Sequence, residues 1–348
     1  MSLQIIRAGL DWLQVSYSGE VSEEVLDRLE QLKAIAQAKE TPQPYPIGLF
    51  ECFVLPRGRG WWAYVLKNPE FELMLAKSNG HGAVASLRLS AFGLANTEPS
   101  VLLDHITGWL PEIGTLKPLS VSRVDVAVDV QGLDPTPEMM GRIVCSASYR
   151  ATHGTEKNVQ TYQFGKGDVV LRVYDKTAEI VHSGKTWVEE SWRFASGYDK
   201  TLPVHRIEVQ LRRKALAELG IDHPAQVLAN PEALLDYGLS WANLRVPSTD
   251  RTKTRWPEDP AWITVRSATF GGTPLQRVVR IPEIMSLDRV MSATLGQIAT
   301  AAAYFETDDY LDALQRLSFA VEVHMMEDKT DFAALVEEKR RRILSKGV

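Results

Sequence analysis

Three stretches of the chain alternate apolar residues with charged residues, and this alternation is the strongest constraint on its fold. A period of two places successive side chains on opposite faces of a β-sheet, so each stretch has one apolar face and one charged face. The stretches are Arg123–Asp129, Val170–Lys176 and Arg206–Arg212. If the three strands are neighbours, carboxylates, a phenol and cations share one surface. That inventory is typical of a metal-dependent phosphoryl-transfer site.

Length and composition indicate a globular protein with ample sequence for a core. The 348 residues can form one large domain or two ordinary ones, and 45% are hydrophobic and 24% charged. No apolar run is long enough for a membrane span, and the N-terminus lacks the layout of a signal peptide, so we expect a cytoplasmic protein. Only Cys52 and Cys145 are cysteines, which excludes a disulfide framework, and the scattered histidines disfavour a zinc site.

The net charge of −5 does not exclude nucleic acid as a partner, because affinity follows the local number of phosphate contacts. Basic residues cluster in three places, and a solvated face explains any one of them taken alone. The clusters are Arg206 with Arg212, Arg213 and Lys214; Arg245 with Arg251, Lys253 and Arg255; and Lys339 to Arg342 with Lys346.

The order of patterns along the chain predicts an α+β fold, an antiparallel sheet with helices packed mainly on one face, followed by a helical C-terminal region. Strands are expected at 8–19, 50–54, 61–66, 83–89, 123–129, 161–164, 169–174 and 206–211. Helices are expected at 22–40, 100–113, 135–146, 176–182, 281–306, 308–326 and 331–346, with further helical segments between 212 and 244. Residues 245–260 are rich in Pro, Thr, Arg and Asp, which predicts a linker or exposed loop. We therefore divide the chain into domains 1–245 and 246–348.

The charged face offers ligands for a hard cation. Mg²⁺ and Mn²⁺ prefer carboxylates and water, and Asp125, Asp129 and Glu208 could supply two or three such ligands. Antiparallel sheets also commonly expose one face with ordinary cross-strand ion pairs, and the alternation alone fits that interpretation equally well.

Tyr174 is the candidate nucleophile on this face. A phenol has a reference pKa near 10, and a nearby cation favours the phenolate, so the flanking Arg172 and Lys176 suit it to attack. Tyr162 and Tyr198 remain competing candidates.

A turn near residue 58 carries a second candidate surface. Trp61 and Trp62 lie beside Arg57 and Arg59 and could stack on unpaired bases. Core or turn packing is the other explanation for these aromatic residues.

Four motifs in order resemble the replication initiation factors of plasmids and filamentous phages, the rolling-circle initiators of the trans-acting type. They are Asp11–Tyr17; Arg123–Asp129; the hairpin Thr161–Gly165 with Arg172–Lys176; and Arg206–Arg212. Gln163 stands where the pattern has tyrosine. The resemblance covers about residues 8 to 214, and the C-terminal third matches nothing.

This resemblance implies a metal-dependent, site-specific endonuclease in domain 1–245 that nicks one DNA strand at a replication origin. Tyr174 would form a 5′-phosphotyrosyl link and leave a 3′ hydroxyl for priming. Asp125 and Glu208 would bind Mg²⁺ or Mn²⁺, with Asp129 as a further candidate ligand.

The resemblance also implies contacts with origin DNA, both duplex and single-stranded. Arg172, Lys176 and Arg206 would contact phosphate, and the wider DNA surface would include Arg212, Arg57, Arg59 and Trp61. The C-terminal helices could form a homodimer, engage a host helicase or read the origin duplex.

Two other functions compete with nicking. One is a non-catalytic DNA-binding regulator of a phage or plasmid that shares the fold. The other is an enzyme acting on small phosphorylated substrates, which the lack of a Gly-x-x-x-x-Gly-Lys-[Ser/Thr] loop disfavours.

Overall fold

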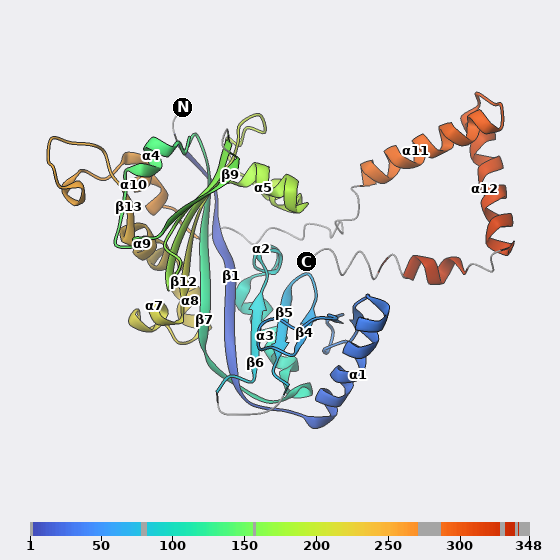
Figure 1. The fold of residues 1–348 in the computed structure, drawn as a ribbon, viewed down its shortest axis with the longest axis horizontal. Coiled ribbons are helices and arrows are strands. Elements are labelled where there is room, and N and C mark those ends of the chain that lie inside the picture. The colour runs from blue at the N-terminus through green and yellow to red at the C-terminus, as the bar shows by residue number, and fades with distance from the viewer. Residues whose placement is uncertain are drawn as a thin grey trace. The chain divides into compact units, whose positions relative to one another are not determined.

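The computed structural model describes residues 3–77, 82–155, 158–270, 287–327, 331–337 and 340, and an 11-stranded antiparallel sheet dominates it (Figure 1). The strand order is β2-β3-β4-β5-β6-β1-β7-β12-β11-β10-β9. The central strands β1 (Gln4–Val21) and β7 (Gly114–Gln131) have 18 residues each and pair along their whole length. The predicted α+β class, with a large antiparallel sheet and C-terminal helices, is confirmed.

The remaining strands are short. On the β1 side they are β2 (Gln43–Pro44), β3 (Phe53–Val54), β4 (Tyr64–Lys67), β5 (Phe71–Leu75) and β6 (Ala85–Leu89). On the β7 side they are β12 (His205–Arg212), β11 (Val169–Asp175), β10 (Asn158–Phe164) and β9 (Arg150–Thr155). Strands β8 (Ile143–Cys145) and β13 (Ala242–Leu244) form a separate two-stranded sheet.

Helices cover mainly the apolar face of the large sheet, where valines such as Val124, Val126 and Val128 are fully buried. Figure 1 shows α8 and α9 on one side of the central strands and α5 on the other. The helices are α1 (Glu23–Lys39), α2 (Ala91–Asn96), α3 (Pro99–Trp109), α4 (Pro137–Gly141), α5 (Lys176–Ser183), α6 (Trp187–Trp192), α7 (Arg213–Glu218), α8 (Pro224–Ala229), α9 (Pro231–Trp241) and α10 (Pro260–Arg266), with 3₁₀ turns at Leu110–Glu112 and Lys253–Arg255.

A glycine lets α9 pack closely on β12. A Cβ atom at Gly238 would lie 2.1 Å from Cγ1 of Val209, so any larger residue would push the helix away from the strand. This contact seals the apolar face directly behind the charged side chains of β12.

On the opposite, polar face, α5 and α6 cover one end of the sheet. There a small apolar cluster forms around the fully buried Trp192, with Ile6, Ile180, Val188 and Val204. The polar face of β7, β12 and β11 carries the charged residues that the alternation predicted, and several of them are buried, namely Asp125, Asp129, Arg206 and Glu208.

The helix expected at 135–146 is wrong in its second half. Only Pro137–Gly141 is helical, and Ile143–Cys145 is a strand that pairs with Ala242–Leu244. Its partner lies about a hundred residues away in sequence, and such a tertiary pairing overrides a local helical pattern. Strand β5 was not expected either.

The segment predicted as a linker returns to the first unit. Arg245 and Glu258 form a β-bridge, and Trp262 in α10 is fully buried, with its indole N–H donating to the carbonyls of Leu239 and Ala242. The contacts divide the chain into units 1–278 and 279–348, later than the expected boundary at 245.

The second unit contains α11 (Leu287–Tyr304) and α12 (Tyr310–Glu327), which contact each other, and residues 332–337 are also helical. Residues 281–286, where the first predicted C-terminal helix begins, and 341–346, where the third ends, lie outside the described residues. Among the helices that are described, none is long and apolar enough to cross a membrane.

Candidate active site on the polar face

The three alternating strands are direct neighbours, in the order β7-β12-β11, so their charged residues share one face. Asp125 is registered opposite Gln210, Glu208 opposite Arg172, and Arg206 opposite both Asp129 and Tyr174. The antiparallel register therefore produces two groups of side chains at different heights on the same face. We call Asp125, Glu208, Tyr174, Arg172 and Arg123 the tyrosine–carboxylate cluster, and Asp11, Asp129 and Arg206 the ion-pair network.

Tyr174 and Glu208 are in direct contact within the tyrosine–carboxylate cluster. The Tyr174 hydroxyl donates to Oε2 of Glu208 at 3.0 Å, while Nη1 of Arg172 donates to Oε1 at 2.8 Å. Burial and the negative charge of Glu208 raise the pKa of Tyr174 well above its ordinary value. The phenol is therefore protonated in the free protein, contrary to the effect expected from its flanking cations. Glu208 stands where it can accept the phenol proton.

Asp125 is buried beside this pair, with 2% of its surface exposed. Arg123 holds it with two hydrogen bonds, one of them from Nε to Oδ1 at 2.8 Å. Burial raises the pKa of Asp125 to about 7, and the charge of Glu208 adds to the rise although the Arg123 hydrogen bonds oppose it. The cluster thus pairs two carboxylates with two arginines, and burial keeps a proton on Asp125 up to about neutral pH.

Gln210 contributes a hydrogen-bond donor without a partner. Its side chain is fully buried, and Oε1 accepts from Nη2 of Arg172 at 3.2 Å. Nε2 has no hydrogen-bond partner among the described residues. A buried unpaired N–H is costly, so this amide is available to an oxygen of a bound ligand.

The ion-pair network lies further along β7 and is saturated. Arg206 is 2% exposed, and it donates from Nε and Nη2 to the two oxygens of Asp129 at 2.6 and 2.9 Å and from Nη1 to Asp11 at 2.5 Å. The indole of Trp192 also donates to Asp129 at 2.8 Å. Arg206, which the sequence predicted to contact DNA phosphate, is thus buried, and these donors face carboxylates inside the protein.

The carboxylates of the ion-pair network have lowered pKa values, in contrast to Asp125. Burial alone would raise the pKa of Asp129, but attraction and hydrogen bonding by Arg206 lower it. Burial likewise opposes the charge on Asp11, yet Arg206 and Lys176 lower its pKa to about 2. Both carboxylates are therefore firmly ionised counter-ions.

A β-bulge brings Asp11 and Trp12 to the polar face together. The β1–β7 register shifts between Leu10 and Trp12, so Asp11 is an extra residue and its neighbour keeps the same face. Trp12 then lies between two guanidinium groups, 4.3 Å from that of Arg88 and 4.0 Å from that of Arg123. The sequence showed Asp11 and Trp12 as a motif, but their roles at the site depend on a bulge that no period of two indicates.

Lys176 is positioned by the start of α5. Asp175 caps that helix by accepting from the N–H of Ala178 at 2.9 Å, which turns the chain directly after Tyr174. The Lys176 ammonium lies 5.7 Å from the Tyr174 ring and pairs with Glu179. Burial and the charge of Arg206 lower the pKa of Lys176. Its contact with Glu179 leaves the ammonium beside the Tyr174 ring rather than on the Tyr174 hydroxyl.

The metal-ligand set expected from sequence is not brought together as a whole. Across the described part of the chain, no group of three or more His, Cys, Asp or Glu side chains is arranged to hold a metal ion. Asp129 is engaged by Arg206 and Trp192. Asp125 and Glu208 remain as a pair whose mutual repulsion a divalent cation would relieve, so these two residues fit a cation completed by water.

The other predicted residues lie away from the cluster. Arg57, Arg59 and Trp61 are exposed in the turn between β3 and β4, and β4 lies six strands from β11, on the order of 29 Å. Trp61 stacks on Trp62 with ring centroids 3.8 Å apart, and Arg59 pairs with Glu72 at 2.6 Å. Arg212 is exposed at the end of β12.

The competing tyrosines are not part of the cluster either. Tyr162 is 5% exposed and belongs to the apolar core, opposite Val173 in the register. Tyr198 lies beside Trp192, with ring centroids 6.0 Å apart, in the cover formed by α6. Tyr174 is therefore the one of the three candidate tyrosines that contacts a carboxylate of the cluster.

Comparison with known proteins gives a distant structural likeness. No family model matches the chain, and no curated protein matches it significantly. Among solved structures, the chain is similar to a rolling-circle replication initiator protein from Geobacillus stearothermophilus, at 16% sequence identity and a TM-score of 0.43. The similarity covers 76% of this chain and 96% of that chain. We base no functional argument on a likeness this distant, so function must come from the site.

Proposed function

We propose that this protein is a metal-dependent DNA-nicking enzyme that initiates rolling-circle replication, with Tyr174 as the nucleophile. The observation that carries the proposal is the hydrogen bond from the Tyr174 hydroxyl to Glu208, beside the buried Asp125, whose pKa burial raises to about 7. A structural surface ion pair requires neither a buried phenol on a carboxylate nor a second carboxylate with a pKa near neutrality.

The proposed step is a transesterification at one phosphodiester. Glu208 takes the phenol proton, and a bond forms between the Tyr174 oxygen and phosphorus. The bond from phosphorus to the 3′ oxygen breaks, and that oxygen receives a proton from water to become a 3′ hydroxyl. The protein then carries a 5′-phosphotyrosyl link, and strand joining is the same step in reverse.

Donors for the nonbridging phosphate oxygens are available around Tyr174. Arg172 and the unpaired Nε2 of Gln210 lie on the adjoining strands of the same face. Arg172 can exchange its bond to Glu208 for one to phosphate when Glu208 binds the proton or a cation. Such charge-assisted donors stabilise the charge that develops in the transition state.

Asp125 and Glu208 would hold the divalent cation, Mg²⁺ or Mn²⁺, with water as the remaining ligands. When bound, the cation would neutralise charge on the phosphate and lower the pKa of the nearby phenol. Asp129 and Arg206 have a different role in this proposal, which is to hold β1, β7 and β12 together beside the reacting groups.

The test is nicking of supercoiled DNA that carries the replicon's own origin, in the presence of Mn²⁺. Wild type should convert it to the relaxed form and remain covalently attached to a DNA strand on a denaturing gel. Tyr174→Phe should lose the adduct and at least about a thousandfold in rate, because the nucleophile is gone.

Tyr162→Phe and Tyr198→Phe are the matched controls, since each removes one phenol hydroxyl outside the cluster. Both should keep the adduct. A covalent adduct that persists in Tyr174→Phe overturns the assignment. Specific origin binding by wild type without any metal-dependent product would identify a DNA-binding regulator instead.

A further inference from the structure

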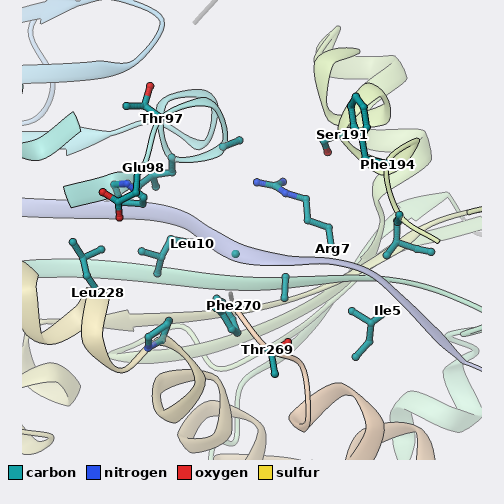
Figure 2. A pocket seen from close by; sticks show the side chains of 18 residues that line it. Ile5, Arg7, Leu10, Thr97, Glu98, Ser191, Phe194, Leu228, Thr269 and Phe270 are labelled. Carbon is teal, nitrogen blue, oxygen red and sulfur yellow. The ribbon is translucent and has the colours of Figure 1, made fainter. Parts of the chain in front are cut away.

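A cavity of about 510 Å³ lies along the edge of β1 from Ile5 to Leu10, close to the ion-pair network (Figure 2). It exists because the neighbouring strand is short. Strand β6 pairs with β1 only at Leu13–Tyr17, and after Leu89 the chain turns into α2, whose cap is Ser90. The edge of β1 before Leu13 is therefore without a strand partner among the described residues on that side. We call this space the β1-edge cavity.

The cavity has one cationic side chain projecting into it. Figure 2 shows the guanidinium of Arg7 extending from β1 into the space between α2 and α6. The nearest carboxylates, Asp129 and Asp11, are engaged by Arg206. No hydrogen bond or ion pair from a described residue engages the Arg7 guanidinium. A half-buried arginine with free donors in a cavity is an anion-binding group.

Other polar groups of the lining are small or already used. Thr97 and Ser191 are the hydroxyl-bearing residues that line the cavity, and the Ser191 hydroxyl donates to the carbonyl of Val188 at 2.6 Å. The Glu98 carboxylate caps α3 by accepting from the N–H of Val101 at 3.0 Å, so its charge is directed at the helix N-terminus. Arg7 is therefore the group that sets the charge preference of the cavity.

The rest of the lining is apolar or aromatic. Figure 2 shows Phe194 on the side of α6 and Leu10, Leu228 and Phe270 on the far side of β1. Phe194 is 73% exposed, which is unusual for a phenylalanine and leaves its ring face available. A nucleic-acid base stacks on such rings and has a face suited to apolar contact.

Size and position agree with one nucleotide. Ligand cavities typically have volumes of about 300–1,000 Å³, so 510 Å³ can hold a base, a sugar and a phosphate. Arg7 is opposite Asp129 in the register, and Asp129 lies four residues from Asp125 on β7, roughly 13 Å along the strand. A strand cleaved at Tyr174 would pass this cavity within a few nucleotides.

We propose that the β1-edge cavity binds a single unpaired nucleotide, with its phosphate on Arg7 and its base against the apolar lining. Resting on the proposed nicking function, this nucleotide belongs to the DNA strand that Tyr174 cleaves and sets the register of that strand. Enzymes that act on nucleic acids commonly extrude a base into a pocket of this kind.

The test measures binding of thymidine 5′-monophosphate and of thymidine to the full chain by ligand-detected NMR. Arg7→Gln should weaken binding of the monophosphate by about tenfold or more, and should leave the weaker binding of thymidine unchanged, because only the phosphate contact is lost. Arg28→Gln on the exposed face of α1 is the matched control for loss of one positive charge, and it should change neither.

A second variant fills the cavity without removing charge. A Cβ atom at Gly9 would meet only Nη2 of Arg7 at 3.7 Å, so Gly9→Val places its methyl groups in the cavity without a backbone clash. It should weaken binding of both ligands. Equal binding of the monophosphate by wild type, Arg7→Gln and Gly9→Val overturns the proposal.

Two further experiments are needed. The first tests whether the bound nucleotide belongs to a DNA strand, and the second tests nucleotide binding separately from nicking. A short oligothymidylate should displace the monophosphate, and failure to displace it would overturn the assignment to a DNA strand. Tyr174→Phe should keep monophosphate binding while losing the covalent adduct. Binding without nicking by wild type contradicts only the proposed function, whereas nicking without binding contradicts only this inference.

Discussion

Asp125 and Asp129 lie on the same strand and the same face, four residues apart, yet their carboxylates have opposite electrostatic environments. Asp129 accepts two hydrogen bonds from Arg206 and one from Trp192, and these contacts lower its pKa despite complete burial. Asp125 is buried as deeply but is held by Arg123 and repelled by Glu208, and its pKa rises to about 7. Asp129 therefore stays ionised as a counter-ion, whereas Asp125 gains and loses its proton near neutral pH.

The contrast between Asp125 and Asp129 distinguishes residues that stabilise the fold from the residues that we propose to be reactive, although both sets lie on the same polar face. Arg206 contacts two carboxylates, and Arg7 and Lys176 add positive charge close by, so the pKa values of Asp11 and Asp129 are both lowered despite burial. For the tyrosine–carboxylate cluster we propose that a cation and a phosphate complete the site. Four variants or conditions test this contrast, in order of decreasing expected effect.

Asp129→Ala should destabilise the protein by about 3–5 kcal/mol, because it leaves the buried Arg206 without its main partner. Urea unfolding near pH 7.5 measures the change in the free energy of unfolding. Asp222→Ala is the matched control, since it breaks an exposed pair with Arg213 and should cost less than about 1 kcal/mol. Equal losses in the two variants would show that Asp129 is an ordinary surface charge.

Asp125→Asn should stabilise the protein above neutral pH, whereas Asp129→Ala destabilises it. The pKa of Asp125 is raised on folding, so its favourable contribution is present below about pH 4 and is lost as the pH rises to about 7. The variant lacks this loss and should be more stable than wild type at pH 8 by as much as about 4 kcal/mol, the equivalent of three pKa units. The measurement is the free energy of unfolding from pH 4 to 8, and parallel curves for the two proteins would contradict it.

Mn²⁺ at ten times its dissociation constant should stabilise wild type by about 1.4 kcal/mol, through binding to the native state alone. Asp125→Asn and Glu208→Gln should lose this stabilisation, whereas Asp129→Asn should keep it although it starts from a lower stability. The stabilisation should be larger at pH 8 than at pH 6, because the proton on Asp125 competes with the cation. Thermal unfolding with and without Mn²⁺ checks all four proteins.

Arg123→Gln should produce the smallest change. Its hydrogen bonds oppose the raised pKa of Asp125, so their loss should move that pKa upward by about one unit. The readout is the pH midpoint of Mn²⁺ stabilisation, and Arg150→Gln, outside the cluster, should leave that midpoint in place. A downward shift in Arg123→Gln would mean that another group controls the proton on Asp125.

Much of the fold followed from local pattern. The alternation correctly predicted β7, β11 and β12 and the side chains that share their polar face, because the period of a strand is local. The helical period likewise predicted α1, which spans Glu23–Lys39. Ile143–Cys145 was expected to be helical and is a strand, because its partner near residue 243 is remote in sequence.

For the site, too, the sequence predicted local features but not those that depend on tertiary structure. Tyr174 and the charged residues of its face could be named from sequence, and their contact with each other required the strand order. Arg7 carried no signal, since one arginine in a terminal strand is ordinary. Its cavity depends on where β6 ends and on how α2 and α6 pack, which are features of the tertiary structure.

The sequence by itself determined which residues lie on the polar face, because a strand's period of two needs only neighbouring residues. It could not decide which carboxylate is neutralised. Only the tertiary structure placed Arg206 between Asp129 and a bulged Asp11 while leaving Asp125 against Glu208. The physical reason is that a pKa depends on burial and on the distances to all nearby charges, which strands far apart in sequence supply only after they pair.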